Sequence, residues 1–223
     1  MLEKIKSIIT GRPEVINKSI KKVAVIIDGG RLRAECHLKR IKITPERVID
    51  VGIKVLSKNE ELFRIYYYDA PPFSGHLVSP ISHKTYKSKT EDLDELKELY
   101  EKIGHQDLVA FRHGTLKFYG WTLRHEIYKD LTQGKGLPNP LSDEHFKPVF
   151  KQKGVDMKIG LDISWLAIKK IVDRIILISA DSDFVPAMKL ARVEGVQVVL
   201  VPMSGRINPD MREHSDEVRK IDI

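Results

Sequence analysis

The sequence predicts an α/β domain built on a doubly wound, mainly parallel sheet with helices on both faces. Residues 21–28, 175–179 and 196–202 are short aliphatic runs rich in β-branched residues, which is typical of strands buried on both faces. Helical patterns alternate with these runs in the second half of the chain, and this alternation favours parallel strands. No linker divides the 223 residues, so we expect a single domain, 1–223.

The first third of the chain predicts strand, helix, helix and strand. The strand 21–28 ends in Asp28, and two glycines then make a turn before a helix that begins near Arg31. Residues 43–58 predict a second helix, because threonine and proline stand at its cap and first turn. The strand 62–70 is stopped by two prolines.

The middle of the chain is less regular. The polar stretch 73–89 predicts a loop, and residues 90–104 predict an amphipathic helix with acids in its first turn. Residues 107–124 predict a hairpin of two strands around a His-Gly turn. The glycines and prolines of residues 130–148 predict another loop.

The last third alternates regularly. We expect a helix over 153–171, a strand at 175–179, a helix over 184–195 and a strand at 196–202. The tail 211–223 is expected to form a short helix or strand at the edge of the sheet.

Composition limits the possible functions. The single cysteine, Cys36, excludes an intramolecular disulfide and a zinc site built from several cysteines. No apolar run is long enough for a signal peptide or a membrane span, so we expect a soluble cytoplasmic protein with no membrane partner. Lys and Arg total 38 against 31 Asp and Glu, a net charge of +7 that is compatible with a polyanionic partner.

Four aspartates are predicted at the carboxyl edge of the sheet. Asp28 ends the first strand, Asp181 and Asp183 follow the strand 175–179, and Asp156 lies in the first turn of a helix. Each alone could be a helix cap or a first-turn acid. Together they would repel one another unless a cation lies between them, and oxygen ligands of this kind suit Mg²⁺ or Mn²⁺.

Ions held by aspartates can promote the displacement of a phosphodiester oxygen, and the basic surface favours nucleic acid as the substrate. A phosphatase or nucleotide hydrolase is a weaker alternative. The chain has no glycine-rich phosphate loop, and Gly30 stands where a second nucleophile-motif acid would be expected.

Three segments carry a family resemblance: VAVIIDGG, KGVDMKIGLDI and IILISADSDFVPAMKLARVEGVQV. Together they resemble the NYN domain family, specifically its LabA-like branch, whose members have a PIN-like nuclease fold. The resemblance covers a core of about 22–203, followed by the tail 204–223, and is loose over 71–150, where we expect an inserted hairpin or loop region. It implies an acidic site that binds Mg²⁺ or Mn²⁺ and cleaves RNA.

Carried over to this sequence, the resemblance implies four catalytic and metal-binding acids: Asp28, Asp156, Asp181 and Asp183. Asp162 matches a further recurrent acid, but it lies about 120° around the helix from Asp156 and cannot face the same ion. We therefore expect Asp162 to support the site or to lie on the helix face. Ser179 and Ser182 could orient carboxylates or bind phosphate, with capping as the alternative.

One residue departs from the family pattern. The first block commonly reads Asp-Gly-x-Asn, and Arg31 stands at the place of that Asn. Arg31 could grip a phosphate or weaken the binding of a metal ion.

Substrate contacts are expected from basic residues near the acids: Arg31, Arg33, Lys153 and Lys158. Phe118, Tyr119 and Trp121 could stack bases, packing within a sheet being the alternative, and Trp165 is expected in the core.

The sequence thus predicts a metal-dependent ribonuclease with RNA as partner. Cleavage of DNA and a homo-oligomeric state stay open. The alternative is a catalytically weak or inactive RNA-binding regulatory module on the same fold.

Overall fold

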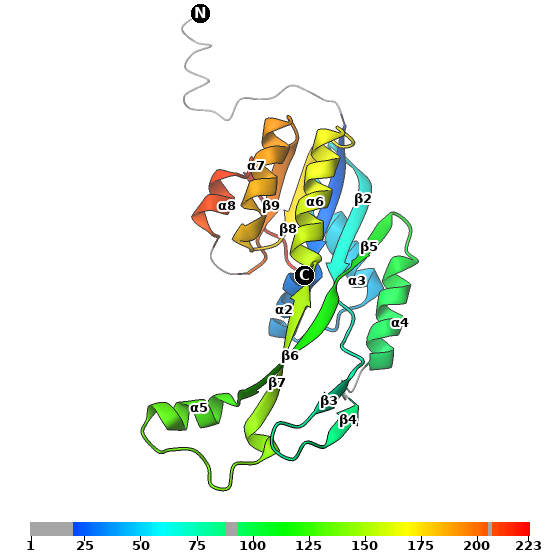
Figure 1. The fold of residues 1–223 in the computed structure, drawn as a ribbon. Helices are drawn as coiled ribbons and strands as arrows, with labels where there is room; N and C mark the ends of the chain where they lie inside the picture. Colours follow the sequence, from blue (N-terminus) through cyan, green and yellow to red (C-terminus); the bar gives the residue numbers. More distant parts are fainter. Residues whose placement is uncertain (1–19, 88–92, 205–206) are drawn as a thin grey trace, which may run out of the picture.

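A six-stranded parallel sheet forms the centre of the computed structural model, which describes residues 20–87, 93–204 and 207–223 (Figure 1). The strand order is β10-β9-β8-β1-β2-β5, and all five pairings are parallel. The strands are β1 (Lys21–Asp28), β2 (Glu60–Asp69), β5 (Val109–His113), β8 (Arg174–Ile178), β9 (Gln197–Val201) and β10 (Glu217–Val218). The predicted fold class is confirmed.

Helices cover both faces of this sheet (Figure 1). One face carries α2 (Gly29–Leu38), α3 (Pro45–Lys54) and α4 (Leu93–Gly104), and the other carries α6 (Val155–Ile168), α7 (Val185–Val193) and α8 (Pro209–Glu213). Alternate strand residues feed the two cores, as Tyr66 and Tyr68 point to one face and Tyr67 to the other. The near-continuous aliphatic runs are explained by this double burial.

The strand order reverses at β1. From β1 the chain adds β2 and β5 on one side, and later β8, β9 and β10 on the other. In open α/β sheets, ligands bind outside the carboxyl ends of the strands at such a switch point. Here the switch point lies between β1 and β8.

The predicted hairpin over 107–124 is wrong in its pairing. Its first half is β5, which joins the main sheet beside β2, and its second half is β6 (Thr115–Leu123). β6 pairs instead with β7 (Phe146–Lys153), an antiparallel partner that lies partly in the predicted loop 130–148 and partly beyond it. An alternating pattern cannot tell which partner a strand takes, because that depends on residues far along the chain.

Residues 115–153 form a unit that we call the arm. It contains β6, α5 (His125–Thr132), the short helix η1 (Asp143–His145) and β7, and it projects away from the sheet (Figure 1). The predicted loop 73–89 contains a second small hairpin, β3 (His76–Val78) with β4 (Thr85–Lys87), beside the arm. None of the residues 115–153 is fully buried.

Other predictions need smaller changes. Trp165 is not in the core but is 58% exposed on α6. The tail forms α8 and β10 at the sheet edge, as expected. The predicted single domain and the helix 90–104 extend into residues outside the described ranges. No helix in the described ranges is long and apolar enough to span a membrane.

Candidate functional site

Asp28 lies at the carboxyl end of β1, where it caps helix α2. Its Oδ1 accepts a hydrogen bond from the Arg31 amide at 3.2 Å, and its Oδ2 accepts one from the Ser179 hydroxyl at 3.1 Å. Gly29 follows because the turn is tight: a Cβ there would lie 2.5 Å from the Tyr68 carbonyl oxygen. Backbone and neighbouring strand therefore fix the orientation of Asp28.

Ser179, which is fully buried after β8, links Asp28 to the next acid. Its hydroxyl accepts a hydrogen bond from the Asp181 amide at 3.2 Å while it donates to Asp28. Asp181 in turn accepts from the Asp183 amide at 3.0 Å and caps the short helix η2 (Ser182–Phe184). The acid that caps is therefore Asp181, whereas Asp183 is exposed.

Asp156 is supplied by another element, in the first turn of α6. It follows Gly154, whose φ of 81° is a left-handed conformation that suits glycine. Burial raises the pKa of the Asp156 carboxyl, and so do the negative charges of Asp181, Asp28 and Asp183. The four acids therefore lie close enough to act on one another electrostatically.

The acids divide into two pairs that line separate hollows. Asp28 and Asp181 line one of about 450 Å³, together with Gly30, Arg31 and Ser179. Asp156 and Asp183 line another of about 640 Å³ between α6 and α7. Within the described part of the chain, no three His, Cys, Asp or Glu side chains are grouped closely enough to hold one metal ion.

Asp162 lies away from these hollows. It accepts hydrogen bonds from the Tyr68 hydroxyl at 2.7 Å and from Arg112 Nε at 3.0 Å. These partners place it on the face of α6 that packs toward β2 and β5. Ser182, which was expected to orient a carboxylate, bind phosphate or cap, is the first residue of η2.

Both predicted arginines are engaged in structural contacts. Arg31 donates to the carbonyl oxygens of Pro202 and Ser204 after β9, although it also lines the hollow with Asp28. Arg33 forms an ion pair with Asp69, a fully buried acid at the end of β2, and donates to the Tyr100 hydroxyl at 3.0 Å.

The two predicted lysines differ in their surroundings. Lys158 donates to the His113 carbonyl oxygen at the end of β5. Lys153 is exposed at the end of β7, three residues before Asp156.

Sequence reasoning missed Asp69 and Gln152. Asp69 ends its strand just as Asp28 does, and that shared pattern could have marked it. The Gln152 side-chain oxygen lies 4.0 Å from the point that a Cβ on Gly30 would occupy. The arm therefore reaches the acids through Gln152, which depends on the unforeseen pairing of β6 with β7.

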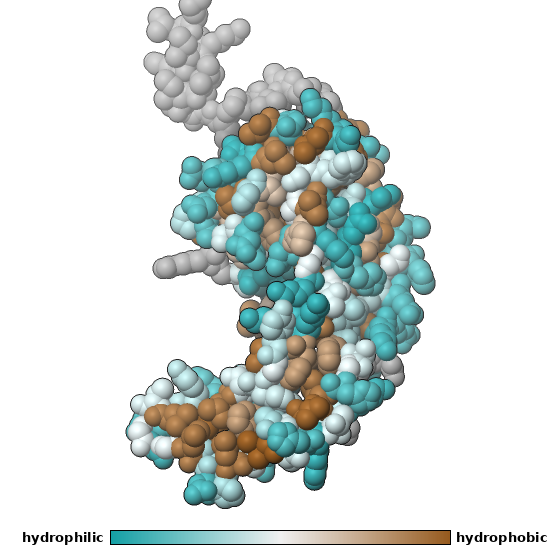
Figure 2. Space-filling model, viewed as in Figure 1, coloured by the Kyte–Doolittle hydropathy of each residue, from teal (hydrophilic) through white to brown (hydrophobic). Residues whose placement is uncertain are grey.

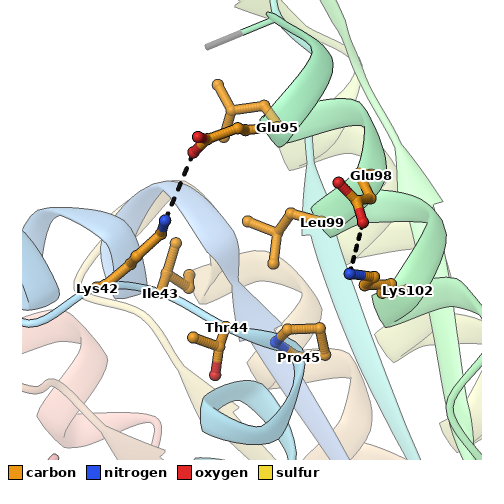
Figure 3. A pocket seen from close by; sticks show the side chains of 9 residues that line it. Lys42, Ile43, Thr44, Pro45, Glu95, Glu98, Leu99 and Lys102 are labelled. Carbon is orange, nitrogen blue, oxygen red and sulfur yellow. Dashed lines mark hydrogen bonds and ion pairs between the residues drawn. The ribbon is translucent and has the colours of Figure 1, made fainter.

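Another hollow, of about 410 Å³, lies between α4 and the segment leading into α3 (Figure 3). Lys42 and Glu95 form an ion pair across it at 3.5 Å, and Glu98 and Lys102 pair along α4 at 2.6 Å. None of the four aspartates lines it, so it is separate from the candidate site.

Fold and site define a doubly wound α/β protein with acids gathered at its switch point. The profile of the NYN domain family matches residues 22–222, so the chain belongs to this family of PIN-like nucleases. The resemblance inferred from the three sequence segments is confirmed.

Two individual proteins are also similar. An uncharacterized protein of Methanocaldococcus jannaschii is 23% identical over 130 residues, which is 58% of this chain and 48% of that protein. The chain thus matches about half the length of that relative. A solved protein of unknown function from Vibrio parahaemolyticus aligns with 92% of this chain and 96% of its own, at 16% identity and a TM-score of 0.49.

Proposed function

We propose that the protein is a metal-dependent ribonuclease that hydrolyses phosphodiester bonds at the carboxyl edge between β1 and β8. One observation carries the proposal: Asp28 and Asp181 line one hollow at the carboxyl edge, Asp156 and Asp183 line another, and the charges of the other three act on Asp156 closely enough to raise its pKa, together with burial. Such a gathering costs stability unless a cation offsets it.

The donor set fits a hard cation. Carboxylate and hydroxyl oxygens are the ligands of Mg²⁺ and Mn²⁺, and Mg²⁺ commonly takes one or two carboxylates and keeps several waters. The pair Asp28 and Asp181, or the pair Asp156 and Asp183, would hold such an ion without a group of three. A bound divalent ion would stabilise the negative charge that develops on the phosphodiester and favour deprotonation of the attacking water.

The protein's own groups orient these acids. The Ser179 hydroxyl holds Asp28 on one side and the Asp181 amide on the other. The Arg31 amide holds the second oxygen of Asp28. Because hydrogen bonds fix both acids before substrate arrives, little reorganisation is needed at the moment of reaction.

The test is incubation of purified protein with labelled single-stranded RNA and DNA in Mg²⁺, Mn²⁺ or EDTA. We expect cleavage that needs the metal and is lost in Asp181→Asn. Asp50→Asn is the matched control, since Asp50 pairs with Lys54 on α3 and lines neither acidic hollow. Equal cleavage by Asp181→Asn would overturn the proposal.

A second function keeps support from Arg31, which lines the same hollow as Asp28 and Asp181. Its positive charge there would weaken the binding of a cation, which favours a nucleic-acid-binding module without turnover. Metal-independent binding of RNA by a folded protein, with no cleavage in any metal, would select this function.

A further inference from the structure

The arm begins and ends beside the acidic site. Its first and last residues are cross-strand partners, Thr115 with Lys153, at the base of the β6–β7 ladder. Lys153 precedes Asp156 by three residues, a span of at most about 10 Å along the chain. The base of the arm is therefore close to Asp156 along the chain.

The two faces of the β6–β7 ladder differ in character. One face carries aromatic packing: Phe118 lies 5.8 Å from Phe150, and Phe73 lies 5.2 Å from Phe150, between ring centroids. Trp121 joins this cluster and donates from its indole to the Val78 carbonyl at 2.9 Å. Phe118 and Trp121 therefore pack the arm against its neighbours.

The opposite face is basic. Side chains alternate along a strand, so the exposed residues Lys117 and Tyr119 of β6 share a side with Lys151 and Lys153 of β7. We call these four residues the basic face. Lys117 and Lys151 are direct cross-strand partners, an arrangement of like charges that is destabilising by itself.

Acidic partners for this face are missing from the described structure. None of the ion pairs found among the described residues includes Lys117, Lys151 or Lys153. A polyanion laid across the strands would neutralise all three charges. The repulsion among these lysines would thus be relieved by a bound ligand that carries phosphate groups.

Tyr119 supplies a ring in the middle of these charges. It is 50% exposed, and the ammonium groups of Lys151 and Lys153 lie 5.2 and 5.5 Å from its ring centroid. An exposed aromatic flanked by cations matches the way proteins bind unstacked nucleic acid, with a base on the ring and phosphates on the cations. Paired bases in a duplex are stacked on each other and cannot use the ring.

We propose that the basic face of the arm binds single-stranded nucleic acid beside the acidic site, with one base stacked on Tyr119. This inference rests on the proposed function for the cleavage that follows binding, but binding by the arm is measurable without cleavage. Preference for a single strand would then arise at Tyr119, because only an unpaired base can stack on its ring.

Binding is measured by fluorescence anisotropy in EDTA, with a labelled single strand of about 12 nucleotides as RNA, as DNA and as a duplex. The full-length protein should prefer the single strand. The double variant Lys117→Gln with Lys151→Gln should bind about tenfold or more weakly, and its log–log salt slope should fall by about 1.4, or 0.7 per lost phosphate contact.

Tyr119→Ala should weaken single-strand binding by about fivefold or more, because one base loses its stacking partner, whereas Tyr119→Phe should keep it. Tyr128→Ala and Lys129→Gln, on α5 in the same arm, are matched controls with no expected effect. Tyr128 is 60% exposed, so it tests whether any exposed ring suffices. Wild-type binding by the lysine variant, or equal loss in the α5 controls, would overturn the inference.

Failures of the two proposals are distinguishable. Arm-dependent binding without metal-dependent cleavage would sink the nuclease and leave the basic face intact. Cleavage with no effect of the arm variants would sink the basic face alone. Circular dichroism of each variant guards against an unfolded arm, and the lysine variant alters only exposed side chains.

Discussion

The two edges of the central sheet treat charge in opposite ways. At the amino edge, Glu60 is surrounded by Arg174 and Arg219, and Glu217 completes the group. At the carboxyl edge, Arg31 lines the hollow of Asp28 and Asp181, and no basic side chain of the described residues lines the hollow of Asp156 and Asp183. The contrast is between a charge cluster whose members compensate one another and a cluster of like charges that the protein compensates less fully.

At the amino edge, the Glu60 carboxylate is paired on every side by groups of the protein. The Glu60 carboxylate is fully buried and accepts from Arg219 at 2.7 and 2.8 Å and from the Ser57 amide at 2.7 Å. Burial by itself raises the pKa of Glu60, but the hydrogen bonds from Arg219, Ser57 and Arg174 outweigh it and lower the pKa to about 2. Its charge is therefore fully compensated by the protein.

The largest expected effect comes from breaking this compensation. Glu60→Gln leaves Arg174 and Arg219 with uncompensated charge in a partly buried place, so it should reduce the free energy of unfolding by about 3 kcal/mol. Urea unfolding followed by circular dichroism measures this. Glu61→Gln, at the exposed neighbouring position, should change stability by less than about 0.5 kcal/mol. Equal effects at both positions would mean that the cluster stabilises nothing.

Acid should remove part of the same stabilisation. The folded-state pKa of Glu60 lies below its ordinary value, so its contribution is complete above about pH 4.5 and is lost as the pH falls toward about 2. We expect the wild type to lose about 2 kcal/mol over this window through Glu60, a loss that Glu60→Gln lacks. Parallel pH profiles for the two proteins would contradict the assignment.

The smallest expected effect has the opposite sign and belongs to the carboxyl edge. The pKa of Asp156 is raised, so its charged form destabilises the fold above that pKa. In EDTA at neutral pH, Asp156→Asn should raise the melting temperature by about 1–2 °C.

Asp162→Asn is the matched control on the same helix. It removes the negative charge that pairs with Arg112 and leaves Tyr68 and Arg112 a weaker, neutral acceptor, so it should lower the melting temperature. If the melting temperature fell in both variants, the charge of Asp156 would be stabilised by the fold. The contrast between the two edges would then be wrong.

Much of this arrangement was predictable from local sequence. Aliphatic runs ending in an acid placed Asp28 and Asp181 at the carboxyl edge, because every strand of a parallel sheet ends on the same side. The position of Asp156 near this edge was predicted from the segment KGVDMKIGLDI, which resembles the family. The division of the acids into two pairs was not predictable, since it depends on side-chain positions across three elements.

The features that were not predicted depend mostly on contacts between residues far apart in the chain. Arg31 was expected at a phosphate, but it binds carbonyl oxygens 171 and 173 residues away, and no local pattern encodes that contact. The chain from 107 to 124 has one continuous alternating pattern, yet it serves the main sheet and the arm in turn. Trp165 was expected in the core because an aromatic on an apolar helix usually packs inward, whereas α6 exposes it.

The arm leaves after Gly114 and returns at Gly154, and its two ends are cross-strand partners. A segment whose two ends adjoin can change in length without altering the path of the sheet. Figure 2 shows apolar residues gathered at its far end, around α5, where Leu137 is 53% exposed. Mutation there meets no closely packed core, so substitutions at the far end of the arm should disturb the sheet and the aspartates less than substitutions in the strands.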